Sequence, residues 1–357
     1  MSRAGRGNTG GFVLVIVLAT LVVLTLLATA VATSAERAIR AAQQDADRFE
    51  GELAMTGTRE TLLFMLATQR QTLAGLTVNE SDASAATAQL AEDPDGFTAL
   101  PVGNEIRLDG TAYQGLETAR FALQDDRGLL SANWAGPALR FALYDSLDVR
   151  ETEWDGLDAK RLDYQDPDDL HRLNGAEKDQ YRRENLSPPS NRTLATPLEL
   201  RRIPGWREML AGMDDAQLLS MLTLSRSVDM NINTAPAAVL QLLPGLPRRN
   251  AERMVEMRRA APFLSVRRAQ ETFGLGAVPE ENLSLFAIPS GNLILWDERS
   301  GARRLLHWTL TPLEIDGPPW RIDYEVTLPR GNEPDQAVVG TPPTPLFAPP
   351  DSAGQRR

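Results

Sequence analysis

Five carboxylates lie close together near the middle of this sequence, in a stretch with one histidine and no cysteine. They are Asp163, Asp166, Asp168, Asp169 and Glu177. Carboxylates this dense repel one another unless water or a cation separates them, and hard oxygen ligands suit Ca²⁺, which takes about six to eight of them. The spacing is not that of an EF-hand. A solvated acidic loop therefore stays open beside a calcium site.

The residue counts also exclude several kinds of chemistry. The 357 residues include no cysteine, which excludes disulfides, thiolate zinc sites and cysteine nucleophiles. A Ser-His-Asp triad would have to use His171 or His307, the only two histidines. The sequence has no Gly-x-Ser-x-Gly elbow and no phosphate-binding glycine loop. We therefore expect no enzyme, with a membrane-anchored periplasmic hydrolase as an open alternative.

A second polar segment lies further along the chain. Residues 231–236 read Asn-Ile-Asn-Thr-Ala-Pro and are followed by Leu-Pro-Gly-Leu at 243–246 and a helical pattern, an order like the helix-hairpin-helix motif that holds DNA phosphate elsewhere. Seven arginines accompany it: Arg248, Arg249, Arg253, Arg258, Arg259, Arg267 and Arg268. Because the net charge is −11, we expect no nucleic acid partner and predict that these arginines pair with the acidic stretch. A membrane-anchored DNA-binding protein of the competence type is the alternative.

An uncharged run at the amino end indicates where the protein resides. Residues 12–32 carry no charge and are long enough for a helix to cross a bilayer. Arg3 and Arg6 precede this run and Glu36 is the first charge after it, so the amino end is predicted to stay cytoplasmic and the rest to be exported. An ordinary signal anchor or secretory signal is the simpler alternative.

The start of the apolar run carries a more specific pattern. Gly10-Gly11-Phe12 resembles a type IV prepilin processing site, where a dedicated peptidase cuts after the glycine and methylates the new first residue. Gly11 and Phe12 are then the processing residues. Most members of that superfamily have glutamate as the fifth mature residue, and this position is Ile16 here. A buried carboxylate needs a neighbouring amino terminus to neutralise it, so a subunit without one suits the end of a filament.

These motifs together resemble the minor pseudopilin of the K type from type II secretion systems, whose members have an apolar residue at the position of Ile16. The Asp-Tyr-Gln-Asp-Pro-Asp-Asp run at 163–169, with Gly-Ala-Glu at 175–177, is similar to that family's calcium-binding segment. The resemblance covers about residues 10–328. It implies a structural subunit at the pseudopilus tip, with calcium bound by some subset of the five carboxylates. The implied partners are the I-type and J-type minor pseudopilins, the inner-membrane secretion platform and the prepilin peptidase.

The expected fold is α+β and pilin-like, with a long N-terminal transmembrane helix, a small antiparallel sheet and a large inserted α-helical domain that contains the helix-hairpin-helix-like motif. Strands are predicted at 105–108, 118–124, 292–297, 305–313 and 321–328. We expect the chain to be single-pass in the inner membrane, with its C-terminal domain in the periplasm. The predicted divisions are a leader (1–11), a transmembrane and amphipathic helix (12–70), a pilin-like part (71–127), the inserted helical domain (128–285), C-terminal strands (286–328) and a disordered tail (329–357).

The long helix is predicted to continue beyond the membrane as an apolar stripe. Ile39, Ala42, Ala46, Phe49 and Leu53 recur at helical spacing, and Leu62, Leu63 and Leu66 follow near the end of the stretch. The stripe packs either on its own domain or on a partner. Gly51 and Gly57 weaken the prediction of a continuous helix.

Overall fold

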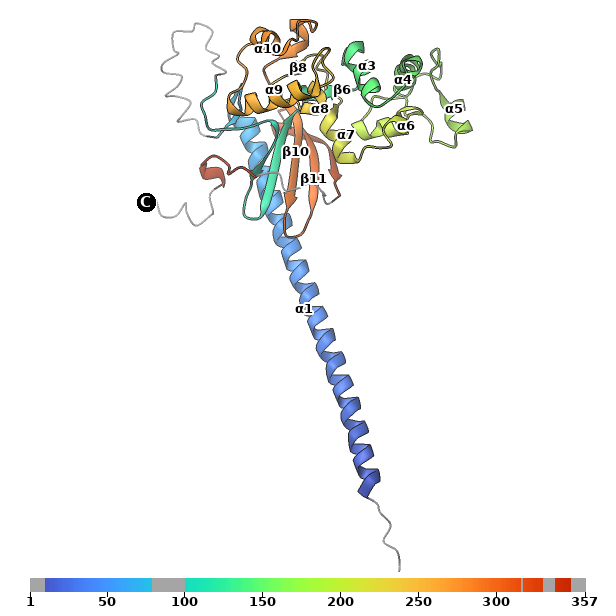
Figure 1. Ribbon diagram of the computed structural model, residues 1–357, viewed down its shortest axis with the longest axis vertical. Helices are drawn as coiled ribbons and strands as arrows, with labels where there is room; N and C mark the ends of the chain where they lie inside the picture. The colour runs from blue at the N-terminus through green and yellow to red at the C-terminus, as the bar shows by residue number, and fades with distance from the viewer. Residues whose placement is uncertain (1–9, 79–99, 316, 330–337, 348–357) are drawn as a thin grey trace, which may run out of the picture.

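A single long helix projects as a stalk from a folded head (Figure 1). The computed structural model describes residues 10–78, 100–315, 317–329 and 338–347. Helix α1 (Gly10–Thr68) begins the described chain, and residues 1–9 of the predicted leader lie outside the described part. At 1.5 Å per residue, α1 is about 90 Å long. It is long and apolar enough to cross a membrane, and its most apolar portion is not buried against any other described part of the chain.

The two glycines do not interrupt α1, because they lie where the head packs closely against it. A Cβ atom at Gly51 would lie 2.5 Å from Asp297 Oδ2, and one at Gly57 would lie 3.0 Å from Leu116 Cδ1. The absence of a side chain therefore lets the helix approach the head, which compensates for the low helix propensity of glycine.

A five-stranded antiparallel sheet packs on the upper part of α1. Its strands are β4 (Asp109–Gln114), β5 (Ala119–Asp125), β10 (Ser290–Asp297), β11 (Arg303–Leu310) and β12 (Trp320–Thr327), in the order β12-β11-β10-β5-β4. The strands predicted at 118–124, 292–297, 305–313 and 321–328 correspond to β5, β10, β11 and β12. Short strands β1 (Gln71–Thr72), β2 (Gly75–Thr77) and β3 (Glu105–Ile106) form a separate three-stranded sheet.

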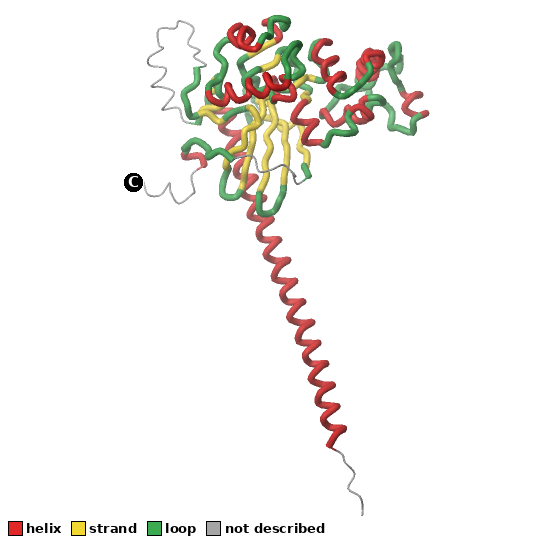
Figure 2. The backbone as a smooth tube through the Cα atoms, in the orientation of Figure 1, coloured by secondary structure: helices red, strands yellow, loops and turns green. Residues whose placement is uncertain are grey.

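A helical block, called the insert below, lies between β5 and β10 in the sequence and covers the far end of the head (Figure 2). Its helices are η1 (Asp126–Gly128), α3 (Pro137–Ser146), α4 (Glu151–Asp163), α5 (Lys178–Arg183), η2 (Pro197–Arg202), α6 (Trp206–Met209), α7 (Asp215–Met221), α8 (Ala237–Leu240), α9 (Arg248–Ala260), α10 (Val266–Phe273) and η3 (Glu280–Asn282). Two parallel pairs of short strands join its parts: β6 (Leu130–Ser131) with β7 (Leu222–Thr223), and β8 (Met230–Asn231) with β9 (Leu283–Ser284).

Two apolar cores hold the head together. One lies between α1 and the sheet and includes Leu62, Met65, Phe121, Leu293 and Trp308. The other fills the insert around buried aromatic residues and reaches the opposite face of the sheet through Leu305. Each large apolar side chain removed from water contributes about 1.5 to 3 kcal/mol. The combination of a long N-terminal helix, an antiparallel sheet and a helical insert confirms the predicted α+β fold.

The stripe predicted on α1 does not continue into its buried face. Leu62, Leu63 and Leu66 are buried against the sheet, whereas Phe49 and Leu53 are 70% and 63% exposed. At 100° per residue, Leu53 and Leu62 lie on opposite sides of the helix. Helix α1 therefore has two apolar faces, of which only one packs on its own head.

The prediction of a disordered tail is wrong for residues 338–347. Val339 forms a parallel β-bridge with Tyr113 of β4, and the backbone N–H of Gln114 donates to Val339 O at 3.2 Å. Phe347, at the end of η4 (Pro345–Phe347), stacks on Phe121 with 5.8 Å between ring centres. The sequence pattern did not predict these contacts, because the two apolar residues Val339 and Phe347 in a Pro-rich segment form no periodic pattern. The remainder of the predicted tail, apart from Pro329, lies outside the described residues.

Candidate metal centre and the junction of insert and sheet

Three of the five predicted carboxylates converge. Oxygen atoms of Asp163, Asp166 and Glu177 all lie within 4.8 Å of one another. Asp163 is the last residue of α4, Asp166 follows in the turn that ends this helix, and Glu177 precedes α5. Glu177 occupies the N-cap position, yet its side chain makes no capping hydrogen bond and belongs to the carboxylate cluster instead.

The backbone between the two helices is shaped to bring these groups together. Asn174 has a φ of 60°, in the left-handed region, and turns the chain back toward α4. Gly175 follows, where an added Cβ would lie 1.9 Å from Asp163 Oδ2. Any side chain at position 175 would therefore occupy the place of a carboxylate oxygen.

The electrostatics of this cluster fit a hard cation. Both carboxylate oxygens of Glu177 and Oδ1 of Asp166 are buried without a hydrogen-bond partner among the described residues. Burial, followed by the charges of Asp163 and Asp166, raises the pKa of Glu177 to about 7. Unpaired buried carboxylate oxygens are costly, and the donor set contains oxygen only. The residues present thus fit Ca²⁺ better than metals that prefer nitrogen or sulfur.

A positive side chain already lies at the cluster. Arg172 Nη1 donates to Asp163 Oδ1 at 2.6 Å and also donates to Asp166 Oδ2. The backbone N–H of Arg172 lies 3.1 Å from Asp163 Oδ2. Arg172 was not among the residues predicted from the sequence, although a basic residue between Asp169 and Glu177 indicates a partner for the neighbouring carboxylates.

Asp168 and Asp169 lie outside the cluster. Asp168 Oδ1 accepts a hydrogen bond from the backbone N–H of Leu170 at 2.8 Å, as in an Asx turn. Asp169 Oδ1 faces Asn191 Nδ2 at 3.5 Å. Both carboxylates are exposed, so neither needs a cation to offset its burial.

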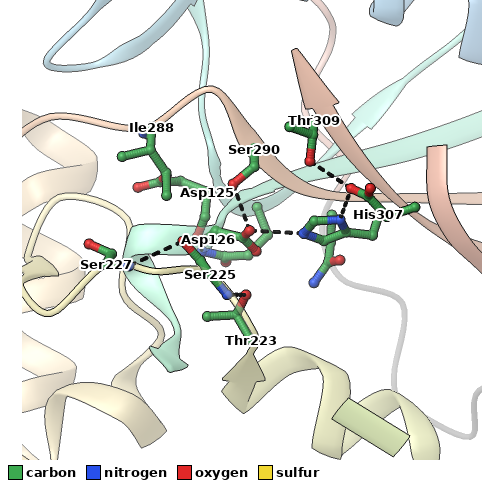
Figure 3. A network of polar contacts seen from close by, with 12 residues as sticks. Asp125, Asp126, Thr223, Ser225, Ser227, Ile288, Ser290, His307 and Thr309 are labelled. Atoms are coloured by element: carbon green, nitrogen blue, oxygen red, sulfur yellow. Dashed lines mark hydrogen bonds and ion pairs between the residues drawn. The ribbon is translucent and has the colours of Figure 1, made fainter. Parts of the chain in front are cut away.

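A second polar network joins the insert to the sheet (Figure 3). Asp125, the last residue of β5, accepts hydrogen bonds from the backbone N–H of Ile288 at 3.0 Å, from Thr234 Oγ1 at 2.7 Å and from Asn231 Nδ2 at 2.9 Å. Burial raises the pKa of Asp125 to about 6 against these hydrogen bonds. The Asn-Ile-Asn-Thr-Ala-Pro segment is thus a structural partner of the strand from which the insert departs.

The next residue, Asp126, connects to the sheet through a histidine. His307 Nε2 lies 2.8 Å from Asp126 Oδ2, and His307 Nδ1 lies 2.8 Å from Asp323 Oδ2 (Figure 3 shows His307 beside Asp126). In the pairing of β11 with β12, His307 opposes Tyr324 and Trp308 opposes Ile322, which leaves Asp323 as the extra residue of a β-bulge. The bulge turns Asp323 onto the same face as His307.

Neither histidine is placed to activate a hydroxyl. Both ring nitrogens of His307 contact carboxylates, and His171 is exposed with its Nδ1 3.3 Å from Arg172 O. Within the described residues, no serine or threonine hydroxyl hydrogen-bonds either ring. The network at His307 therefore has the composition of an ion cluster, in which the hydroxyls of Ser290 and Thr309 donate to the carboxylates and do not contact the ring.

The predicted pairing of the seven arginines with the acidic stretch is wrong. Arg248 and Arg267 pair with Glu252 and Glu271 on their own helices. Arg258 is buried and donates to Ile232 O at 3.0 Å and to Ala235 O, with its Nε 3.7 Å from Asp109 Oδ2. In the described part of the chain none of the seven forms an ion pair with residues 163–177. The helix-hairpin-helix motif stays a prediction, since α8, the helix before the hairpin, has only four residues.

Two segments of the chain match family models, and they contain the carboxylate cluster and the Asn-Ile-Asn-Thr-Ala-Pro segment. Residues 230–287 match a family described as "Type II secretion system (T2SS), protein K", and residues 123–212 match a second family model with the same description. No curated protein matches the sequence. A chain in the crystal structure of the GspK-GspI-GspJ complex from the enterotoxigenic Escherichia coli type 2 secretion system matches this chain with a TM-score of 0.47 and 13% identity, covering 82% of this chain and 99% of that chain.

Proposed function

We propose that this chain is a minor pseudopilin of the protein K family of the type II secretion system, anchored in the inner membrane by α1, and that it forms the tip of the pseudopilus. Its role there is structural rather than catalytic. The observation that carries this proposal is the second apolar face of α1, which its own head leaves exposed. Ile39, Phe49, Leu53 and Phe64 lie on that face.

An apolar helix face above a membrane anchor needs a partner, because water does not solvate it well. The partners we propose are the I-type and J-type minor pseudopilins, which accompany GspK in the solved complex. Their membrane helices would run beside α1 and cover this face. The inner-membrane platform would hold the assembly at its base.

The test replaces apolar residues on this face with charge. Phe49→Asp together with Leu53→Asp should abolish co-purification with the I-type and J-type subunits and stop secretion, while the unfolding midpoint of the head stays unchanged. Gln44→Asp is the matched control, since Gln44 is exposed on the opposite side of the helix. Intact assembly of the double variant would contradict the proposal.

The position at the tip is supported by Ile16, which is apolar and lies within the membrane portion of α1. A subunit without a carboxylate there has nothing to pair with the amino terminus of a subunit ahead of it. Ile16→Glu should disturb capping more than membrane insertion. Cross-linking that finds copies along the whole pseudopilus would rule out a tip position.

Calcium at Asp163, Asp166 and Glu177 is a second part of the proposal. The unpaired oxygens of Glu177 support it, because a folded protein rarely leaves a buried carboxylate without a partner. Binding to the folded state alone stabilises it by about 2.7 kcal/mol when free Ca²⁺ is a hundredfold above the dissociation constant. Chelation should therefore lower the unfolding midpoint of the detergent-solubilised chain.

Variants locate this effect. Glu177→Gln should remove most of the Ca²⁺-dependent rise in the unfolding midpoint, whereas Asp168→Asn should leave it intact, because Asp168 lies outside the cluster. Equal midpoints of the parent with Ca²⁺ and with chelator, and no calcium by elemental analysis, would leave a solvated acidic loop.

A further inference from the structure

We propose that Arg172 is a built-in competitor of the cation at Asp163, Asp166 and Glu177. Its guanidinium holds two of the three carboxylates when no metal is bound and leaves them when Ca²⁺ binds. This inference rests on the calcium centre proposed above and describes how that centre is regulated.

Arg172 and a metal ion would use the same atoms. Arg172 Nη1 contacts one oxygen of Asp163 and one of Asp166. Asp163 is completely buried, so its charge needs a cation close by in either state. An ion bound among the three carboxylates would lie beside the guanidinium, and like charges at that distance repel. The two cations are therefore alternatives.

Glu177 distinguishes the two states. No described donor reaches either of its oxygens, so Arg172 satisfies two carboxylates and leaves the third unpaired. A metal ion among all three would engage Glu177 as well. The arginine-bound state thus leaves one buried carboxylate unpaired, and Ca²⁺ can pair with all three.

The exchange requires little movement of the chain. The Arg172 side chain is 43% exposed, so its guanidinium can turn into water. Its backbone N–H donates to Asp163, and that contact does not depend on where the side chain lies. The segment between α4 and α5 can therefore keep its path while the cation changes.

The experiment measures Ca²⁺ binding to the detergent-solubilised full chain by calorimetry, and its unfolding midpoint with Ca²⁺ and with chelator. Arg172→Gln should bind Ca²⁺ about tenfold more tightly than the parent, a difference of about 1.4 kcal/mol. Its midpoint should be lower than that of the parent in chelator and equal to it in Ca²⁺. Arg172→Lys, which keeps the charge, should bind like the parent.

Arg182→Gln is the matched control, since Arg182 pairs with Asp179 at 2.9 Å on the neighbouring surface of α5 and away from the cluster. The contrary result is that Arg172→Gln binds Ca²⁺ no more tightly than the parent, with its unfolding midpoint lowered equally in Ca²⁺ and in chelator. That result would show that Arg172 stays on the carboxylates in both states, and it would overturn this inference while leaving the calcium centre in place. Absence of Ca²⁺ binding in both the parent and Arg172→Gln would overturn the calcium centre and this inference together.

Discussion

The imidazole of His307 lies 2.8 Å from the carboxylate of Asp126, and this contact joins a sheet strand to the first residue of the insert. The histidine is nearly buried, and Asp323 takes its other ring nitrogen. Burial alone would lower the pKa of His307, but the hydrogen bonds to Asp126 and Asp323 outweigh it and raise the pKa to about 9. His307 is therefore a cation at neutral pH.

The first prediction is a loss of stability at alkaline pH. The folded pKa of about 9 is above the unfolded value of 6.5, so the stabilisation is complete below pH 6.5 and is lost as the pH rises through 9. Its size is up to about 3 kcal/mol. Chemical unfolding at pH 7 and pH 10 should show His307→Gln less stable than the parent at pH 7, with the gap closing by pH 10.

His171→Gln serves as the control for this experiment, because His171 is exposed and its ring contacts a backbone carbonyl rather than a carboxylate. A gap between the parent and His307→Gln that stayed constant across this range would mean that His307 is neutral in the folded protein.

The second prediction concerns the close approach of α1 to the sheet. Gly51→Val should destabilise the head by about 1 to 3 kcal/mol, because its Cβ would overlap a buried carboxylate that Ser300 N–H holds at 2.7 Å. Gly57→Ala should be neutral or stabilising, since only the end of the Leu116 side chain is near and alanine favours helix. Denaturant unfolding of both variants measures the difference. Equal changes in the free energy of unfolding for the two variants would mean that the close approach of α1 to the sheet does not limit the side chain at position 51.

The third prediction concerns processing. The mature chain should begin at methylated Phe12, because Gly11 directly precedes the apolar run, and Gly11→Val should block the cleavage. Intact-mass spectrometry of the purified membrane form measures both. An intact Met1 end, or cleavage near Ala32, would remove the prepilin interpretation.

The fourth prediction separates packing from DNA binding at α9. Arg258→Met should lower the free energy of unfolding by about 3 kcal/mol, because two carbonyl oxygens lose their donor and Asp109 loses its cation. Arg253→Met, on the exposed side of the same helix, should cost at most about 1 kcal/mol, because among the described residues its guanidinium contacts only the Phe273 ring, 6.0 Å from the ring centroid. Adding either variant to labelled DNA should leave the fluorescence anisotropy of the DNA unchanged. Binding with a steep salt dependence that Arg253→Met weakens would favour the competence-type alternative.

The sequence was informative where periodicity carries the signal. The apolar run at 12–32 predicted α1, and the alternation of apolar and polar residues in 321–328 predicted β12. Both predictions were possible because each element repeats the same pattern of apolar positions along its length. The partner of each face was not predictable: Leu53 and Leu62 have the same chemistry, and only the position of the sheet determines which is buried.

At the candidate metal centre, composition predicted the stretch but not which carboxylates converge. Asp166 and Asp168 are two residues apart, yet one lies in the cluster and the other caps a turn, because side-chain direction depends on the local backbone. Gly175 and Arg172 approach the carboxylate cluster through contacts across the turn. No spacing rule anticipates such contacts.

The position of the insert between β5 and β10 in the sequence also affects the cost of pairing these two strands. Asp125 pairs with Gly291, so β5 and β10 form a hairpin whose loop is the entire insert. Closing an unstructured loop of that length costs roughly 3 kcal/mol more chain entropy than closing a four-residue turn. An insert that has already folded holds the two strands together and removes most of this cost. Strand β5 can pair with β4 before the insert folds, whereas its pairing with β10 becomes favourable once the helices have formed.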